Sequence, residues 1–269
     1  VNTHVDDVYR ATYKRVYERN RRYYNRYPMD VGRVHRIVRY LKENAVEMPS
    51  GGVLTPQRFL QLGLGLGSKT GMESLHWLIE GAWVPDGTEL SHEFLKNVES
   101  MQAFETNPIY YLLHEPIYAD REGPMGWSAQ RILEEVLPEM PEFNPEGAMT
   151  GEKPVYFTGE MVYPWMADGA YPRLTPLKET AHKLAEEKNW GAIYDSSKLR
   201  DTPVPCAALV SYEDLYVERE FSEKTAKLLG DKCQLWITNE HQHSGLRDDG
   251  YGVLSKLIAM ARGDDVTPS

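Results

Sequence analysis

The sequence has little cysteine, no long apolar run and no excess of positive charge. Its two cysteines, Cys206 and Cys233, lie in apolar stretches without a CxxC or Cys/His spacing, so we expect reduced core thiols and no metal site. No segment approaches the roughly 18 consecutive apolar residues that cross a bilayer. The first residues also lack the basic-then-apolar pattern of a signal peptide. These absences predict a globular, cytoplasmic protein with no metal, no cofactor and no membrane partner.

The overall charge is unfavourable for binding nucleic acids. The 269 residues include 30 basic and 40 acidic side chains, which give a net charge of -10. Basic residues gather between Arg10 and Lys42, where they alternate with tyrosines, as in some RNA-binding arms. However, Tyr9, Tyr13 and Tyr17 recur every four residues and would share one helix face. We therefore favour a packed helix with a solvated basic side, and no nucleic-acid partner.

The first half of the chain predicts helices and almost no strands. Thr55 followed by Pro56 is typical of a helix start, and Asp30 is expected to act as an N-cap. Val155–Phe157 is short and β-prone. The helices are expected over residues 5–27, from Asp30 onward, and over 59–83, 91–104, 127–136 and 177–188.

The last third of the chain has the pattern of one βαβα unit. Strands are expected over residues 204–211 and 234–238, and helices over 222–229 and 251–262. Such strands should be parallel and adjacent, joined by a right-handed crossover. A parallel sheet is normally covered on both faces and has more than two strands, so this unit is expected to be the end of a larger doubly wound sheet.

An acidic residue and a histidine follow these two strands. Asp214 comes after the first strand and His243 after the second, so both should lie at the edge of the sheet where α/β proteins place their active sites. In a catalytic triad a carboxylate orients the imidazole, which takes the proton of the nucleophile. The order acid, then histidine, matches α/β-hydrolases. The pattern alone is equally compatible with two surface loop residues.

Four stretches of the sequence resemble one enzyme family. They are Asp7–Tyr13 (DVYRATY), Leu112–Ala119 (LLHEPIYA), Phe157–Trp165 (FTGEMVYPW) and Asn239–Arg247 (NEHQHSGLR). They are similar to the longer prolyl aminopeptidases, also called proline iminopeptidases, and the resemblance covers essentially the whole chain. Only the helical cap and the C-terminal part of that family are represented. The family's His-Gly-Gly-Pro-Gly loop and its Gly-x-Ser-x-Gly nucleophile turn do not occur in this sequence.

The resemblance implies the C-terminal part of an α/β-hydrolase fold, with a parallel sheet and a large helical cap. Residues 1–200 would form the cap and a connecting segment, and 201–269 the closing strands and helices of the core. It implies an aminopeptidase that releases N-terminal proline from peptides, with Asp214 and His243 as acid and base. The serine would come from an N-terminal segment or a partner chain. A different hydrolase, such as an esterase or amidase, and a non-catalytic fragment remain as alternatives.

Two features compete with this assignment. Gly63–Thr70 (GLGLGSKT) is similar to a phosphate-binding loop, but Ser68 replaces an essential glycine and the stretch follows no strand, so tight helix packing is the better interpretation. Ser68 also lacks the flanking glycines of a nucleophile turn. His241 is the other candidate base. The resemblance favours His243, because the family histidine directly precedes the Ser-Gly-Leu-Arg run.

An aminopeptidase must also bind a charged amine, and a carboxylate in a partly desolvated pocket does so, because an unpaired ammonium is costly to bury. Glu115 and Glu160 are the candidates within the family-like stretches, and Glu73 is a weaker one. Each of these carboxylates has the alternative of capping a helix or pairing with an arginine.

Overall fold

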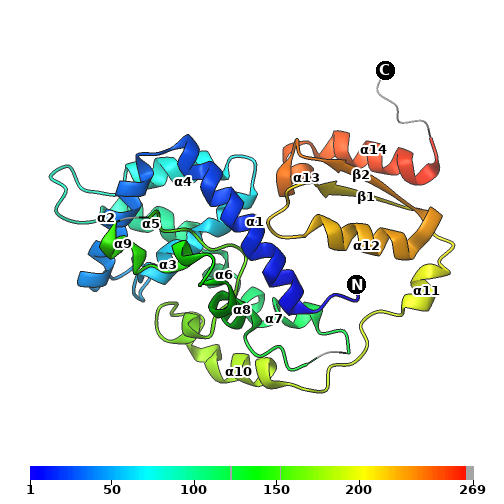
Figure 1. Cartoon of the computed structure of the whole chain (residues 1–269), viewed down its shortest axis with the longest axis horizontal. Helices are drawn as coiled ribbons and strands as arrows, with labels where there is room; N and C mark the ends of the chain where they lie inside the picture. The colour runs from blue at the N-terminus through cyan, green and yellow to red at the C-terminus, as the bar shows by residue number, and fades with distance from the viewer. Residues whose placement is uncertain (122, 152, 265–269) are drawn as a thin grey trace.

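The computed structural model describes residues 1–121, 123–151 and 153–264. Helices dominate the first part of the chain, and a strand and helix unit follows it (Figure 1). The first part contains α1 (Val5–Arg26), α2 (Asp30–Glu43), α3 (Pro56–Leu60), α4 (Gly71–Glu80), α5 (His92–Ser100), α6 (Ala103–Thr106), α7 (Pro108–Leu113), α8 (Ser128–Val136), α9 (Gly147–Thr150) and α10 (Lys178–Glu186). The second contains α11 (Ser196–Arg200), β1 (Cys206–Ser211), α12 (Arg219–Leu229), β2 (Cys233–Thr238), α13 (Gly245–Asp248) and α14 (Gly250–Arg262).

Short 3₁₀ helices join several of these elements. They are η1 (Gln61–Gly67), η2 (Pro116–Tyr118), η3 (Pro141–Phe143), η4 (Pro164–Ala167), η5 (Thr175–Leu177), η6 (Gly230–Lys232) and η7 (Gln242–Ser244). Among the helices of the described residues, none is both long and apolar enough to cross a membrane.

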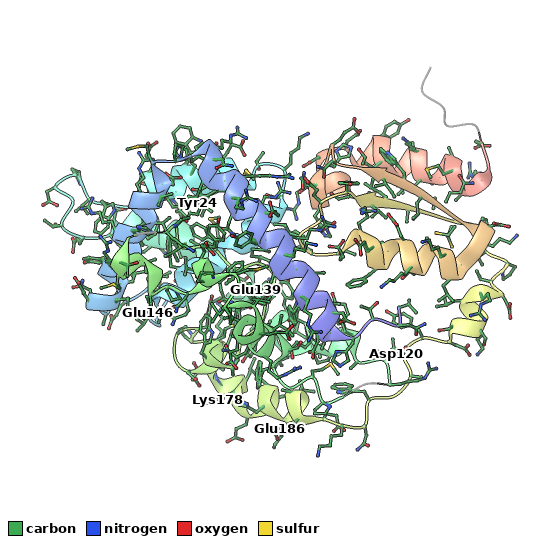
Figure 2. All side chains as sticks on the ribbon, viewed as in Figure 1. Tyr24, Asp120, Glu139, Glu146, Lys178 and Glu186 are labelled. Carbon is green, nitrogen blue, oxygen red and sulfur yellow. The ribbon has the colours of Figure 1, made fainter. Side chains whose placement is uncertain are left out.

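The main hydrophobic core lies within the helical part. Tyr9 and Tyr13 on α1 are buried in it, and Tyr17, the third residue of the expected helix face, is partly buried against it. Figure 2 shows all side chains: Glu146 and Lys178 lie on the outside of this part, whereas Tyr24 is buried. Most basic residues of α1 are exposed, as expected for the solvated side of a packed helix, but Arg19 is buried and Arg15 is half-buried.

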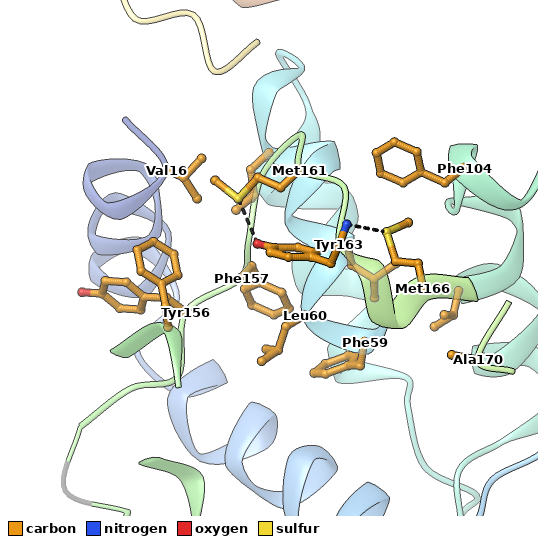
Figure 3. Packing of buried hydrophobic residues seen from close by; sticks show 14 of the residues in the cluster. Val16, Phe59, Leu60, Phe104, Tyr156, Phe157, Met161, Tyr163, Met166 and Ala170 are labelled. Atoms are coloured by element: carbon orange, nitrogen blue, oxygen red, sulfur yellow. Dashed lines mark hydrogen bonds between the residues drawn. The ribbon is translucent and has the colours of Figure 1, made fainter. Parts of the chain in front are cut away.

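An extended segment, residues 154–163, crosses this core without joining a sheet. The β-prone Val155–Phe157 lies in it, but a side chain takes the place of a neighbouring strand: Phe157 donates its N–H to Asn20 and accepts from the Asn20 amide, both at 2.9 Å. Further along, Tyr163 donates its hydroxyl to the Met161 sulfur (3.1 Å) and its N–H to that of Met166 (3.3 Å) (Figure 3). These contacts satisfy both backbone groups of Phe157 and the N–H of Tyr163 without a neighbouring strand.

The two strands are adjacent and parallel, as predicted. Cys206 pairs with Cys233 and Ser211 with Thr238. Helix α12 lies on one face of the sheet, and α13 and α14 on the other (Figure 1). Most strand residues are only half-buried. The sheet thus contributes little to the main core. Among the described residues after α10, Leu215 is buried in that core.

Several expected helix boundaries need correction. Asp30 is the first residue of α2 and not its N-cap, because its buried carboxylate accepts hydrogen bonds from Tyr23 and Arg33 and contacts His76. The helix expected over 59–83 is interrupted between Gly67 and Gly71, and the one over 91–104 ends at Ser100. Thr55 does cap α3, accepting the Arg58 N–H at 3.1 Å.

Candidate active site

Asp214 lies in the turn that follows β1, where its side chain is held by the backbone. Its Oδ1 accepts the N–H groups of Tyr216 (2.8 Å) and Val217 (3.0 Å). An Asp that accepts N–H groups two and three residues onward forms a local turn that fixes its rotamer. Asp214 is only 7% exposed. The carboxylate is therefore both rigid and largely shielded from water.

His243 follows β2 and faces this carboxylate. Its Nδ1 lies 2.9 Å from Asp214 Oδ2 and 3.1 Å from Oδ1, so the two side chains meet as the parallel strands predict. The hydrogen bond to Asp214 raises the pKa of His243 above its usual value of 6.5, against the opposing effect of burial. With Nδ1 bound to a carboxylate, the neutral imidazole presents Nε2 as its proton acceptor. This is the arrangement of a general base with its orienting acid.

Tyr216 supports the histidine from the side. Its ring meets that of His243 edge to face, with 4.7 Å between the ring centroids. Its hydroxyl donates to the carbonyl of Leu64 in η1, and Gly67 lies against the ring. A Cβ at Gly67 would come within 2.3 Å of Tyr216 Cζ. The glycine-rich stretch therefore packs its backbone against a side chain that contacts the histidine. No sequence signal identified Tyr216.

A cavity of about 430 Å³ lies beside His243 and is lined by both parts of the chain. The helical part contributes Tyr110, His114 and Glu160, and the strand and helix unit contributes Tyr216 and His243. The remaining wall is apolar and comes from Ile109, Leu113, Ile117, Tyr118 and Val217. A concave, mainly apolar site with a few polar groups is typical of small-ligand pockets.

Glu160 is the candidate carboxylate that the structure brings into this cavity. Its Oε1 accepts a hydrogen bond from the Tyr110 hydroxyl, and its backbone carbonyl contacts His114 Nε2 at 3.2 Å. Its negative charge also contributes to the raised pKa of His243. Close packing fixes the preceding residue, because a Cβ at Gly159 would lie 2.6 Å from a methyl group of Val16. The position of Glu160 is thus set by the extended segment and α1 together.

Glu115 points elsewhere. It is 4% exposed, and its Oε1 accepts the N–H of Ala129 at 3.1 Å, at the start of α8. Burial raises the pKa of Glu115 to about 7, although hydrogen bonds from the backbone of α8 oppose this effect. It lines a small cavity with Tyr111 and Trp127, apart from the one that contains His243. Its contacts are those of a helix-capping carboxylate.

Glu73 is likewise engaged outside the cavity. It lies in the first turn of α4 and forms an ion pair with Arg26 on α1, with 2.6 Å between nitrogen and oxygen. Of the five residues expected in the site, the structure therefore brings Asp214, His243 and Glu160 together. Glu115 instead binds the N-terminus of α8, and Glu73 pairs with Arg26.

The competing residues have other surroundings. His241 packs edge to face on Trp236, and Asp214 contacts His243 instead. Ser68 lines a second cavity beside Asp214 and His243, but its hydroxyl donates to the Gly65 carbonyl at 3.0 Å. Within the described residues, no serine hydroxyl forms a hydrogen bond with His243.

Comparison with known proteins identifies relatives of the chain. No family model matches the sequence. The chain is 41% identical over 258 residues, or 96% of its length, to a proline iminopeptidase of Aeromonas sobria. This chain is homologous to the proline iminopeptidases. A second proline iminopeptidase, from Aspergillus aculeatus, is 33% identical over 249 residues, or 90% of the chain. The chain spans 57% and 52% of the lengths of these two homologues.

Proposed function

We propose that the protein to which this chain belongs is a serine aminopeptidase that releases N-terminal proline from peptides. The observation that carries the proposal is the contact between His243 and the buried Asp214 beside a cavity that also contains Glu160. The names of the two homologues point to the same activity. In this proposal His243 is the general base, Asp214 orients it, and neither a metal nor an organic cofactor takes part.

The chemistry proceeds through an acyl-enzyme. His243 Nε2 takes the proton of a serine hydroxyl as the serine oxygen attacks the carbonyl carbon of the N-terminal proline residue. The protonated His243, stabilised by Asp214, then gives that proton to the departing amine, and the peptide bond breaks. Water, activated by the same histidine, attacks the ester and releases proline. Asp214 keeps Nδ1 protonated throughout, so that Nε2 alternates between accepting and donating the proton.

Glu160 is the side chain we assign to the substrate amine. A proline amine is a secondary ammonium on an apolar ring, and the cavity combines one carboxylate with aromatic and aliphatic walls. Burying that charge without a partner would be costly, so the carboxylate determines which substrates enter. Tyr110 donates to Glu160 and holds it in place. Glu115 and Glu73 are less suited to this role, since one binds the N-terminus of α8 and the other Arg26.

The serine would come from a segment of the full-length protein, or a partner chain, that completes the sheet of an α/β-hydrolase. Within the described residues β1 pairs only with β2, which leaves its other edge open. Cavities of about 450 and 580 Å³ lie along β1 on the sides of α12 and α14. In this proposal residues 201–269 are the closing part of that core and residues 1–200 its cap and connecting segment.

A substrate panel tests the proposal on the full-length protein. Prolyl-β-naphthylamide should be hydrolysed faster than alanyl-β-naphthylamide and p-nitrophenyl acetate. His243→Ala should reduce this rate by at least about 10⁴-fold, as removal of a triad member does. His241→Ala, the matched control, should leave it within a fewfold range. Hydrolysis of the acetate ester without any aminopeptidase activity would support an esterase instead.

A further inference from the structure

Helix α1 presents three arginines to the loops that carry Asp214 and His243. Arg15, Arg19 and Arg22 share one face of the helix. Arg15 binds both carboxylate oxygens of Glu218, at 2.7 and 2.8 Å. Arg22 binds both oxygens of Glu213. Arg19 donates to the Gln242 side-chain oxygen. A helix of the cap part thus contacts residues next to both members of the acid–base pair.

Two of these contacts are linked into a closed ring. The Asn239 amide donates to Glu213 at 2.9 Å, and the Gln242 amide donates to Asn239 at 3.2 Å. Gln242 in turn accepts from Arg19, which lies one helical turn from Arg22 on α1. The ring therefore runs from α1 through the loop after β1 and the loop after β2, and back to α1.

The ring holds the residues that directly precede the acid and the base. Glu213 is followed by Asp214, and Gln242 by His243. A displacement of either neighbour changes the 2.9 Å contact between the two side chains, and small errors in catalytic geometry reduce rates strongly. We propose that Arg22 and Arg19 are positioning residues: from α1, they hold the side chains of Asp214 and His243 in hydrogen-bonding contact. This inference rests on the function proposed above.

The charges in the ring suit this role. The hydrogen bond from Arg22 lowers the pKa of Glu213 to about 2, so Glu213 stays ionised over the pH range in which a histidine base works. The side chain of Arg22 is 52% exposed and that of Glu213 is 20% exposed. Ion pairs with so much solvent access contribute little to stability. The expected effect of breaking the pair is therefore on geometry more than on folding.

Arg22→Ala in the full-length protein tests the proposal, with Arg15→Ala as the matched control. Both variants remove a bidentate arginine–glutamate pair from the same helix face, but Glu218 lies beyond the turn that contains Asp214. For Arg22→Ala we expect kcat on prolyl-β-naphthylamide to fall roughly 10-fold with KM changed less than about twofold. The pKa of His243, followed by NMR on histidine labelled with ¹³C, should fall, because a looser Asp214 contact raises it less.

The control and the conservative variant separate positioning from folding. Arg15→Ala should leave kcat and the pKa of His243 unchanged, even where it lowers the unfolding midpoint. Arg22→Lys retains the charge without the two-pronged contact and should restore part of kcat. If Arg22→Ala fails to fold, Glu213→Gln supplies the same test, since Gln still accepts from Asn239.

Equal kcat and equal pKa of His243 in the Arg22 and Arg15 variants would overturn the inference. The NMR titration also separates it from the proposed function. A wild-type protein that releases no proline refutes the function, whereas an unchanged pKa of His243 in Arg22→Ala, or in Glu213→Gln, refutes the positioning role.

Discussion

Replacing Glu115 by glutamine should stabilise the protein at alkaline pH. The carboxylate is buried and accepts the Ala129 N–H at the start of α8. Glutamine keeps a carbonyl oxygen for that hydrogen bond and cannot ionise. The substitution therefore removes the titration of Glu115 while leaving its helix-capping contact in place.

The size and the sign of the effect follow from the pKa. Burial raises the pKa of Glu115 from 4.5 to about 7, so the folded protein binds this proton more tightly than the unfolded chain. The corresponding stability is present below pH 4.5 and is lost as the pH rises through 7. One pKa unit corresponds to about 1.4 kcal/mol, which gives a cost of about 3 kcal/mol at pH 8 and under about 1 kcal/mol at pH 5.

Urea denaturation of the full-length protein, followed by tryptophan fluorescence, measures this difference. The gain in unfolding free energy of Glu115→Gln over wild type should be about 2.5 kcal/mol larger at pH 8 than at pH 5. Glu139→Gln, which changes an exposed carboxylate, should show no such dependence. Identical pH dependence in Glu115→Gln and wild type would refute the reasoning. Unchanged stability with a loss of prolyl activity would instead assign Glu115 to the substrate amine.

Three further substitutions test the site. Asp214→Asn should lower kcat by about 10⁴-fold. It should also move the acid limb of the pH–rate profile to lower pH, because Asp214 raises the pKa of His243, which must be neutral to act as the base; an unmoved limb would mean that another group titrates. Glu160→Gln should slow prolyl-naphthylamide cleavage roughly 100-fold while sparing an acetate ester, whose lack of an amine makes it the control; equal losses would indicate a folding role. Gly67→Ala should lower both kcat and the unfolding midpoint, because its Cβ would meet the Tyr216 ring at 2.3 Å. Gly65→Ala is the control and should be tolerated, since the nearest atom to its Cβ is Met101 Cε at 3.6 Å; equal effects of the two substitutions would contradict this.

The strand and helix unit was predictable because local patterns determine it. The apolar runs that predict β1 and β2 are bounded by turn residues, and the parallel pairing follows from the helix between them. The contact between Asp214 and His243 follows from the same rule, since both side chains come after strand ends at one edge of the sheet.

Other features depend on contacts between distant residues, which periodicity does not reveal. Val155–Phe157 has strand-like composition, but Asn20 on α1 satisfies the backbone of Phe157. Glu115 and Glu160 occur in similarly apolar stretches, yet one caps α8 and the other lines the cavity of His243. In each case a partner far along the chain decides the outcome, so the sequence alone left the alternatives open.

Labelling with a fluorophosphonate tests the central claim most directly. This reagent attaches to a serine that a neighbouring histidine has activated. In the full-length protein, we predict a labelled serine outside residues 1–269, with labelling abolished by His243→Ala and retained in His241→Ala. A label on a serine within these residues, such as Ser68, or labelling that persists in His243→Ala, would contradict the account.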